Sequence, residues 1–166
     1  FRLFLAIASK PAALEKLLAD TSGTPFMRGK AHFRLATLYY AQESYDKARE
    51  HYLAKEIKEL QERDRFTAET QAAECLAHKE KYEQAAEEFL RAAKNPDYQE
   101  KISFLLVRYG ELLFLAKKYN EGRAVFQKVT KDFPKTEDAS RAYYQQGLHE
   151  QVDLKAYETA LNFYDS

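Results

Sequence analysis

The sequence predicts an all-α fold, a right-handed superhelical solenoid of antiparallel helix pairs. Apolar residues recur every three to four positions in one segment after another, as on one face of a helix. A short pattern of aromatic and small residues also returns at a nearly constant interval, which is typical of repeat architectures. Finally, only 5 Gly and 4 Pro occur in 166 residues, and the prolines lie between the apolar segments.

The repeated pattern is a tyrosine, a small residue three positions later, and an aromatic four positions after that. Tyr45, Tyr82 and Tyr119 follow one another at intervals of 37 residues, and Tyr157 follows after 38. The small and aromatic residues of the four copies are Ala48 and Tyr52, Ala85 and Phe89, Gly122 and Phe126, and Ala160 and Tyr164. We place the one extra residue of the last interval in a turn between Glu150 and Lys155.

Each period reads as two helices joined by a turn. In the first unit, one helix begins at Pro25, with Thr24 as its N-cap, and a second begins at Tyr45 and continues to Ile57 and Leu60. Small residues at the repeated position let the two helices of a unit approach closely. Further boundaries are predicted at Asn95-Pro96, at Phe133-Pro134 and at Thr136-Glu137-Asp138.

The N-terminal stretch, residues 1–24, reads as a partial repeat unit. Phe1 to Ser9 would end one helix, and Pro11 to Asp20 would form its partner before Gly23. Residues 25–166 would then hold about four helix pairs. We expect the array to form part of a longer one, because neither end carries an obviously polar cap.

The repeat resembles the tetratricopeptide family over residues 25–166. That family carries a large and a small residue and then an aromatic on the first helix, and a Tyr, a small residue and an aromatic on the second. The matching first-helix positions are Leu35-Ala36 with Tyr39, Ala72-Ala73 with Leu76, and Tyr109-Gly110 with Leu113. The resemblance implies stacked helix pairs whose first helices line a concave groove that binds protein segments.

Two segments resemble units of bacterial envelope repeat proteins more narrowly. These segments are Ala13 to Asp20, and Phe126 to Thr136 with the tyrosines that follow it. The proteins concerned are of the Sec translocon ancillary, Tol–Pal accessory and outer-membrane assembly lipoprotein type. This second resemblance implies a periplasmic or membrane-anchored scaffold, with a cytoplasmic repeat protein as the alternative.

Several classes of function are disfavoured by composition. Lys+Arg and Asp+Glu both number 26, so no net charge attracts nucleic acid or anionic lipid. No glycine-rich phosphate loop or nucleophile elbow is present, and the four histidines lack metal-ligand spacing. The single cysteine, Cys75, reads as a buried small residue rather than a reactive thiol. We therefore expect no enzyme activity, no cofactor and no small-molecule substrate.

The candidate partner-binding residues are those that the resemblance places on the concave side of the first helices. They are Lys30, Phe33, Thr37, Tyr40, Thr70, Glu74, His78, Phe104, Val107, Glu111, Phe114, Arg141 and Tyr144, with Thr67, Ala77, Leu148 and Gln151 beside them. This mixed polar and aromatic stripe suits a peptide or helix lying in a groove, although an ordinary tolerant surface would read the same way. A clamp for acidic C-termini is not expected. The places where repeats of that kind carry Lys, Asn and Arg hold Phe33, Thr37, Gln71 and Phe104 here, with only Arg108 basic.

The leading functional hypothesis is a non-catalytic scaffold that binds a protein or peptide partner through this groove. A second hypothesis is self-assembly, in which open array ends stack with other copies as a homo-oligomer. A third is a docking segment of a larger protein whose activity lies outside this sequence.

Overall fold

The computed structural model describes residues 11–20 and 22–164, with side-chain environments up to Glu150. Over this part of the chain the fold is all-helical, with no strand, which confirms the predicted fold class at that level. The predicted helix end at Phe1 to Ser9 lies outside the described residues. The elements are α2 (Pro11–Ala19), α3 (Pro25–Ala41), α4 (Tyr45–Tyr52), η1 (Lys55–Glu59), α5 (Glu62–His78), α6 (Tyr82–Ala93), η2 (Pro96–Lys101), α7 (Ile102–Leu115), α8 (Tyr119–Asp132) and α9 (Glu137–Tyr164), where η marks a 3₁₀ helix.

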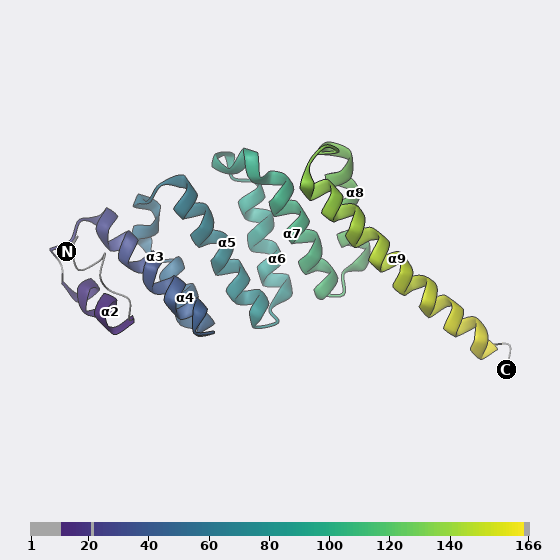
Figure 1. The fold of residues 1–166 in the computed structure, drawn as a ribbon, viewed down its shortest axis with the longest axis horizontal. Helices are drawn as coiled ribbons and strands as arrows, with labels where there is room; N and C mark the ends of the chain where they lie inside the picture. The colour runs from purple at the N-terminus through teal and green to yellow at the C-terminus, as the bar shows by residue number, and fades with distance from the viewer. Residues whose placement is uncertain (1–10, 21, 165–166) are drawn as a thin grey trace.

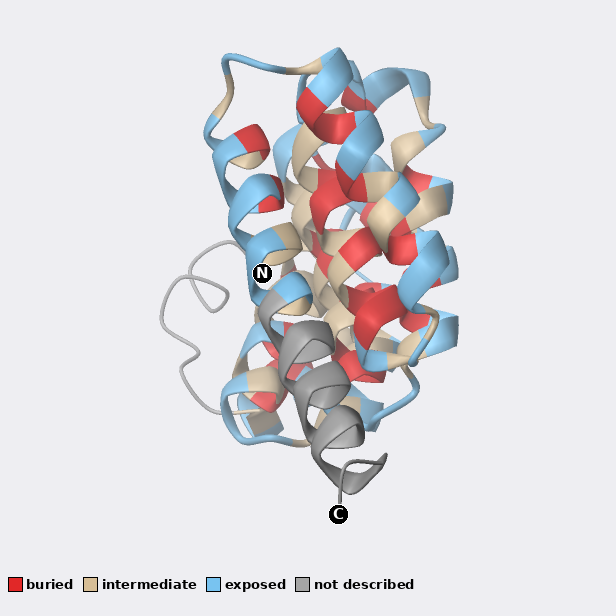
Figure 2. Cartoon of the chain, turned by 90° about the vertical axis from the view of Figure 1, so that its right-hand side faces the viewer, coloured by how far each residue is buried: buried red, intermediate tan, exposed pale blue. Residues whose placement is uncertain are grey.

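The helices stand side by side in chain order, each packed against the next (Figure 1). The helices α3, α5 and α7 open the three units and are called first helices below, and α4, α6 and α8 are called second helices. Buried side chains follow the seam between the two sets, and exposed residues cover the outside (Figure 2). Among the described residues, no helix is long and apolar enough to cross a membrane.

The turn between the two helices is the same in all three units. Its central residue has a positive φ in each case: Glu43 at 57°, Glu80 at 59° and Lys117 at 62°. The next residue donates its N–H to the carbonyl five positions back, from Ser44 to Tyr39 (2.9 Å), from Lys81 to Leu76 (2.9 Å) and from Lys118 to Leu113 (2.8 Å). This bonding is that of a Schellman motif, which ends a helix at a left-handed residue. The 37-residue period is therefore a period of backbone geometry as well as of sequence.

The predicted helix starts agree with the structure. Thr24 caps α3 by accepting a hydrogen bond from the Met27 N–H at 3.3 Å, and Pro25 occupies the first turn. Thr136 likewise accepts from the Ala139 N–H at 3.1 Å at the start of α9. Asn95 accepts from the Asp97 N–H at 3.0 Å and opens η2 rather than an α-helix.

The second helix of the first unit is shorter than the periodicity predicts. It ends at Tyr52, and Ile57 lies on the separate 3₁₀ helix η1. Ile57 and Leu60 are nevertheless buried, as their apolar character requires. The break lets η1 fold back against α3, where a Cβ atom on Gly29 would overlap the carbonyl oxygen of Glu56. Because glycine has no Cβ, the backbone of η1 can approach α3 this closely.

The turn predicted between Glu150 and Lys155 is absent, because α9 runs as one helix from Glu137 to Tyr164. The three observed turns each place a left-handed residue between two helices that pack together. No Pro interrupts the helix in the Glu150 to Lys155 segment. The fourth period is thus a single helix, where two were predicted.

The small residues of the repeat lie where the helices of a unit meet. Ala48 and Ala85 are fully buried, and Gly122 is buried as well. Cys75 is 1% exposed, and burial raises the pKa of its thiol to about 11, so it is a core residue as predicted. Stability in such a stack comes from contacts between neighbouring helices, because no single pair can bury its own apolar face.

Candidate partner-binding face

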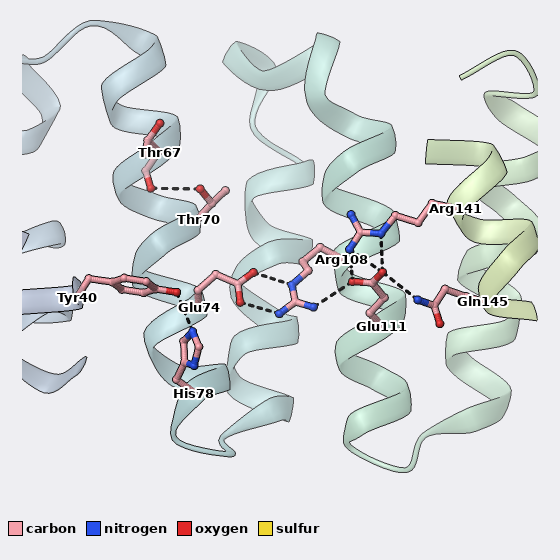
Figure 3. Close-up of polar contacts among 9 residues, drawn as sticks. All are labelled: Tyr40, Thr67, Thr70, Glu74, His78, Arg108, Glu111, Arg141 and Gln145. Atoms are coloured by element: carbon pink, nitrogen blue, oxygen red, sulfur yellow. Dashed lines mark hydrogen bonds and ion pairs between the residues drawn. The ribbon is translucent and has the colours of Figure 1, made fainter. Parts of the chain in front are cut away.

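A row of polar and aromatic contacts crosses α3, α5, α7 and the beginning of α9 (Figure 3). We call the surface along this row the first-helix face. We assign to it the residues Tyr40, Thr67, Glu74, His78, Arg108, Glu111, Arg141 and Gln145, which Figure 3 labels, and add Lys30 and Thr37 of α3 and Phe104 of α7. Contacts between helices join α3 to α5, α5 to α7 and α7 to α9, and the Arg108–Glu111 pair adds a contact within α7.

Between α3 and α5, the contact is aromatic. The Tyr40 hydroxyl lies 2.8 Å from Nε2 of His78 and shares a hydrogen bond with it. The Tyr45 ring, at the start of α4, stacks on the His78 imidazole with centroids 4.5 Å apart. Burial, reinforced by the nearby charge of Glu74, raises the pKa of Tyr40 to about 12, so its hydroxyl stays protonated. Lys30 and Asp64 form an ion pair farther along the same two helices.

Between α5 and α7, Arg108 forms a two-pronged ion pair with Glu74. Its Nε and Nη2 atoms each lie 2.6 Å from one carboxylate oxygen, and its Nη1 donates to Glu111 at 3.0 Å. The three side chains are only 10–22% exposed. The hydrogen bonds that Arg108 donates to Glu74 raise the pKa of Arg108 still further, so this guanidinium carries its charge throughout the working pH range.

Between α7 and α9, Glu111 repeats the role of Glu74. It receives two hydrogen bonds from Arg141, both at 2.7 Å, and a longer one from Gln145 at 3.4 Å. Glu111 lies 37 residues after Glu74, and Gln145 lies 37 residues after Arg108. The same repeat positions therefore bridge α5 to α7 and α7 to α9.

Three predicted partner-binding residues are in fact buried. Val107 is 0% exposed, Phe114 7% and Thr70 8%, so the prediction that they line an open groove is wrong. Phe114 stacks on Phe126 with ring centroids 5.5 Å apart and on His149 at 3.5 Å. The packing of the next helices, α8 and α9, covers α7 on the side where the resemblance places a groove.

The other predicted residues reach solvent to different extents. Lys30, Phe33, Tyr40, Glu74, Phe104 and Glu111 are half-buried, whereas Thr37, His78, Arg141 and Tyr144 are exposed. Tyr144 is 65% exposed and takes no part in the row of contacts. Of the neighbouring positions, Thr67 is half-buried, Ala77 is buried, Leu148 is exposed, and the side chain of Gln151 lies outside the described residues.

Arg108 and Gln145 belong to the face but are absent from the candidate set that the sequence supplied. The resemblance picks positions one turn apart on each helix and passes over the residue between them. Their 37-residue separation, together with that of Glu74 and Glu111, is the sequence signal that could have found them.

A histidine pair joins α3 and α4, and spacing along a single helix does not reveal it. The Nδ1 atom of His32, on α3, lies 2.9 Å from Nδ1 of His51, on α4. Burial lowers the pKa of both imidazoles, and for His32 the neighbouring His51 lowers the pKa further. No group of three or more His, Cys, Asp or Glu side chains within the described part of the chain could hold a metal ion.

A hollow of about 650 Å³ lies on the side of the second helices. Arg49, Glu69, Glu88 and Arg91 are among the residues that line it. Arg49 forms a bidentate ion pair with Glu88, at 2.8 and 2.5 Å, and also donates to the Ala72 carbonyl at 2.8 Å. This arrangement ties α4 to α5 and α6, and its mixed charges select neither an anion nor a cation.

No protein-family model matches the chain, and no curated protein sequence matches it either. The tetratricopeptide assignment therefore stays a prediction that depends on the repeat itself.

Proposed function

We propose that the chain is a non-catalytic protein-interaction scaffold, built as a right-handed superhelical solenoid of the tetratricopeptide type. Its first-helix face would bind an extended or helical segment of a partner protein. The observation that carries this proposal is the continuous row of contacts from Tyr40 and His78, through Glu74 and Arg108, to Glu111 and Arg141.

The row supports binding because its side chains are held in place before any partner arrives. Arg108 is fixed by two carboxylates, and the Tyr40 ring lies edge-on to both Tyr45 and His78. Side chains that are already ordered lose little conformational entropy on binding, so more of each contact contributes to affinity. Phe104 and Tyr40, both half-buried, offer aromatic surface beside these polar groups, which suits a mixed polar and apolar segment.

The charged side chains on the face are paired with one another, and this pairing indicates the net charge to expect of a partner segment. Arg108 and Arg141 are each matched by a glutamate, and Lys30 by Asp64. A strongly acidic or basic tail would have to break these pairs. We therefore expect a partner segment of low net charge that recognises the face by hydrogen bonds and by contact with aromatic rings.

The test is affinity capture with a variant that blocks the face and leaves the row intact. Thr37→Arg together with Thr67→Arg places two long cations on α3 and α5, at positions whose hydroxyls bond only within their own helix or weakly to Tyr52. The matched control is Gln84→Arg with Gln127→Arg, which adds the same charge at exposed positions of α6 and α8. We expect the face variant to lose at least about tenfold in captured partner, equivalent to about 1.4 kcal/mol. Equal capture by the two variants, with unchanged melting curves, would place binding elsewhere.

A further inference from the structure

The outer surface of α9 carries an apolar strip that nothing in the described chain covers. Tyr143 is 59% exposed, Tyr144 65% and Leu148 39%. A Cβ atom on Gly147 would meet no atom within 4 Å. We call these four residues the α9 strip. Contiguous exposed apolar residues of this kind mark interaction surfaces more often than scattered ones do.

The equivalent residues of the preceding unit show which kind of element covers such a strip. Tyr143, Tyr144 and Gly147 lie 37 residues after Leu106, Val107 and Gly110 of α7. There the equivalent residues are buried, and Leu106 and Val107 share a core cluster with Phe126 and Val129 of α8 and Ala142 of α9. A Cβ atom on Gly110 would lie 2.6 Å from the Phe126 ring. The equivalent of the α9 strip is thus covered by an antiparallel helix that places an aromatic ring over the glycine.

The sequence for such a covering helix lies within α9 itself. Tyr157, Ala160 and Tyr164 repeat Tyr119, Gly122 and Phe126 of α8 with the same spacing. However, α9 is one continuous helix, and Gly147 and Tyr164 are 17 residues apart along it. At about 1.5 Å per residue this separation is about 25 Å, so the second half of α9 cannot fold over the strip of its own chain.

We propose that the α9 strip is an interface with a second copy of this chain, formed by two antiparallel α9 helices. In α7 and α8, Gly110 faces Phe126, and Phe114 lies against Gly122. Transferring that register to α9 sets Gly147 of one copy opposite Tyr164 of the other. This arrangement has a two-fold axis. Gly147 of the first copy lies opposite Tyr164 of the second, and Tyr164 of the first copy lies opposite Gly147 of the second with the same geometry. In this arrangement the second half of α9 in each copy covers the α9 strip of the other copy. This inference does not depend on the partner-binding role of the first-helix face.

Disulfide trapping tests the register directly. The double variant Gly147→Cys with Tyr164→Cys should oxidise to a covalent dimer, seen on a non-reducing gel and reversed by a reductant. Each single variant should stay monomeric on the same gel, because like positions of the two copies lie far apart in this register. Gly147 has open space for the new side chain, and the native Cys75 is buried and should not compete.

Two results would overturn the proposal. An intramolecular disulfide in the double variant, with monomer mass and loss of both engineered thiols, would show that the second half of α9 folds back in its own chain. A monomer mass for the unmodified chain in sedimentation at about 100 µM, with no covalent dimer in the double variant, would exclude an interface of useful strength. A dimer in sedimentation that Gly147→Arg weakens at least about tenfold would support the proposal independently of any disulfide.

Discussion

Gly122 lies so close to Phe114 that a Cβ atom placed on it would be 2.6 Å from two carbon atoms of the Phe114 ring. The Phe114 ring cannot easily retreat, since it is 7% exposed and stacked between Phe126 and His149. The equivalent positions of the first two units hold alanine, at Ala48 and Ala85. Compared with the second unit, where Ala77 is equivalent to Phe114, the third unit has a smaller residue on the second helix and a larger one on the first helix.

We expect Gly122→Ala to destabilise the chain although alanine is the better helix former. The helix preference would add about 1 kcal/mol of stability, whereas forcing a methyl group against a packed ring costs about 1–3 kcal/mol. The net loss should be about 1 kcal/mol in chemical unfolding. As a control, Gly147→Ala on open α9 surface should gain about 0.5–1 kcal/mol at concentrations where the chain is monomeric. A stabilised Gly122→Ala variant would show that the α7–α8 contact is looser than described.

Introducing a glycine at the left-handed position of a turn should stabilise the chain. Glu80 has a φ of 59°, a conformation that costs an L-residue about 1 kcal/mol and glycine very little. We expect Glu80→Gly to raise the unfolding free energy by about 0.5 kcal/mol after the entropy of the unfolded chain is counted. Glu87→Gly, at an exposed position inside α6, should lower it by about 1 kcal/mol. If both substitutions destabilise equally, the left-handed turn is not maintained in solution.

Replacing Arg108 with lysine should weaken the connection between α5 and α7. Lysine keeps the charge but cannot form two parallel hydrogen bonds to Glu74 while a third reaches Glu111. Because these groups are largely buried, we expect a loss of about 1–2 kcal/mol in urea unfolding. Arg141→Lys, at a side chain that is 42% exposed, should cost less than about 1 kcal/mol. Equal losses for the two variants would mean that burial does not strengthen the first pair.

The His32 and His51 pair should make the first unit sensitive to mild acid. Burial lowers both pKa values below the ordinary 6.5, with Glu50 and, at His32, Glu56 opposing the shift and Arg28 adding to it. The unfolded chain then binds more protons than the folded chain just below pH 6.5, so the unfolding free energy falls as the pH drops through that range. We expect Tm to fall between pH 7.5 and pH 5.5, and to fall less in His32→Asn. A Tm that declines equally in both proteins would exclude these imidazoles as the cause.

The sequence predicted the three complete units well because their signals are local. Tyr82, Ala85 and Phe89 lie within two turns of one helix, and the proline and threonine caps act within three residues. Spacing alone could not show that α4 ends at Tyr52, because that depends on Gly29 admitting the backbone of η1 from another element. The fourth unit was predicted incorrectly. The second half of α9 repeats the sequence of α8, but α9 continues as one helix through the place where the repeat predicts a turn.

The candidate face was predicted only in part, because membership depends on what the neighbouring helices cover. Thr37 and His78 are accessible as expected, whereas Val107 and Phe114, which were also predicted to line the groove, are buried against α8 and α9. Spacing along one helix indicates the direction in which a side chain points, but it does not show whether another helix buries that side chain. Spacing along one helix also does not reveal the ion pair of Arg108 with Glu74, which is 34 residues away in the chain; only the 37-residue repeat of both positions points to it.

The most direct test of the scaffold hypothesis is photo-cross-linking to the captured partner from single positions. A photoreactive residue at Thr67, on the first-helix face, is compared with one at Glu87, on the exposed side of α6. We predict a covalent adduct with the partner from Thr67 and none from Glu87. An adduct from Glu87 alone would contradict the account and would move partner binding to the second helices.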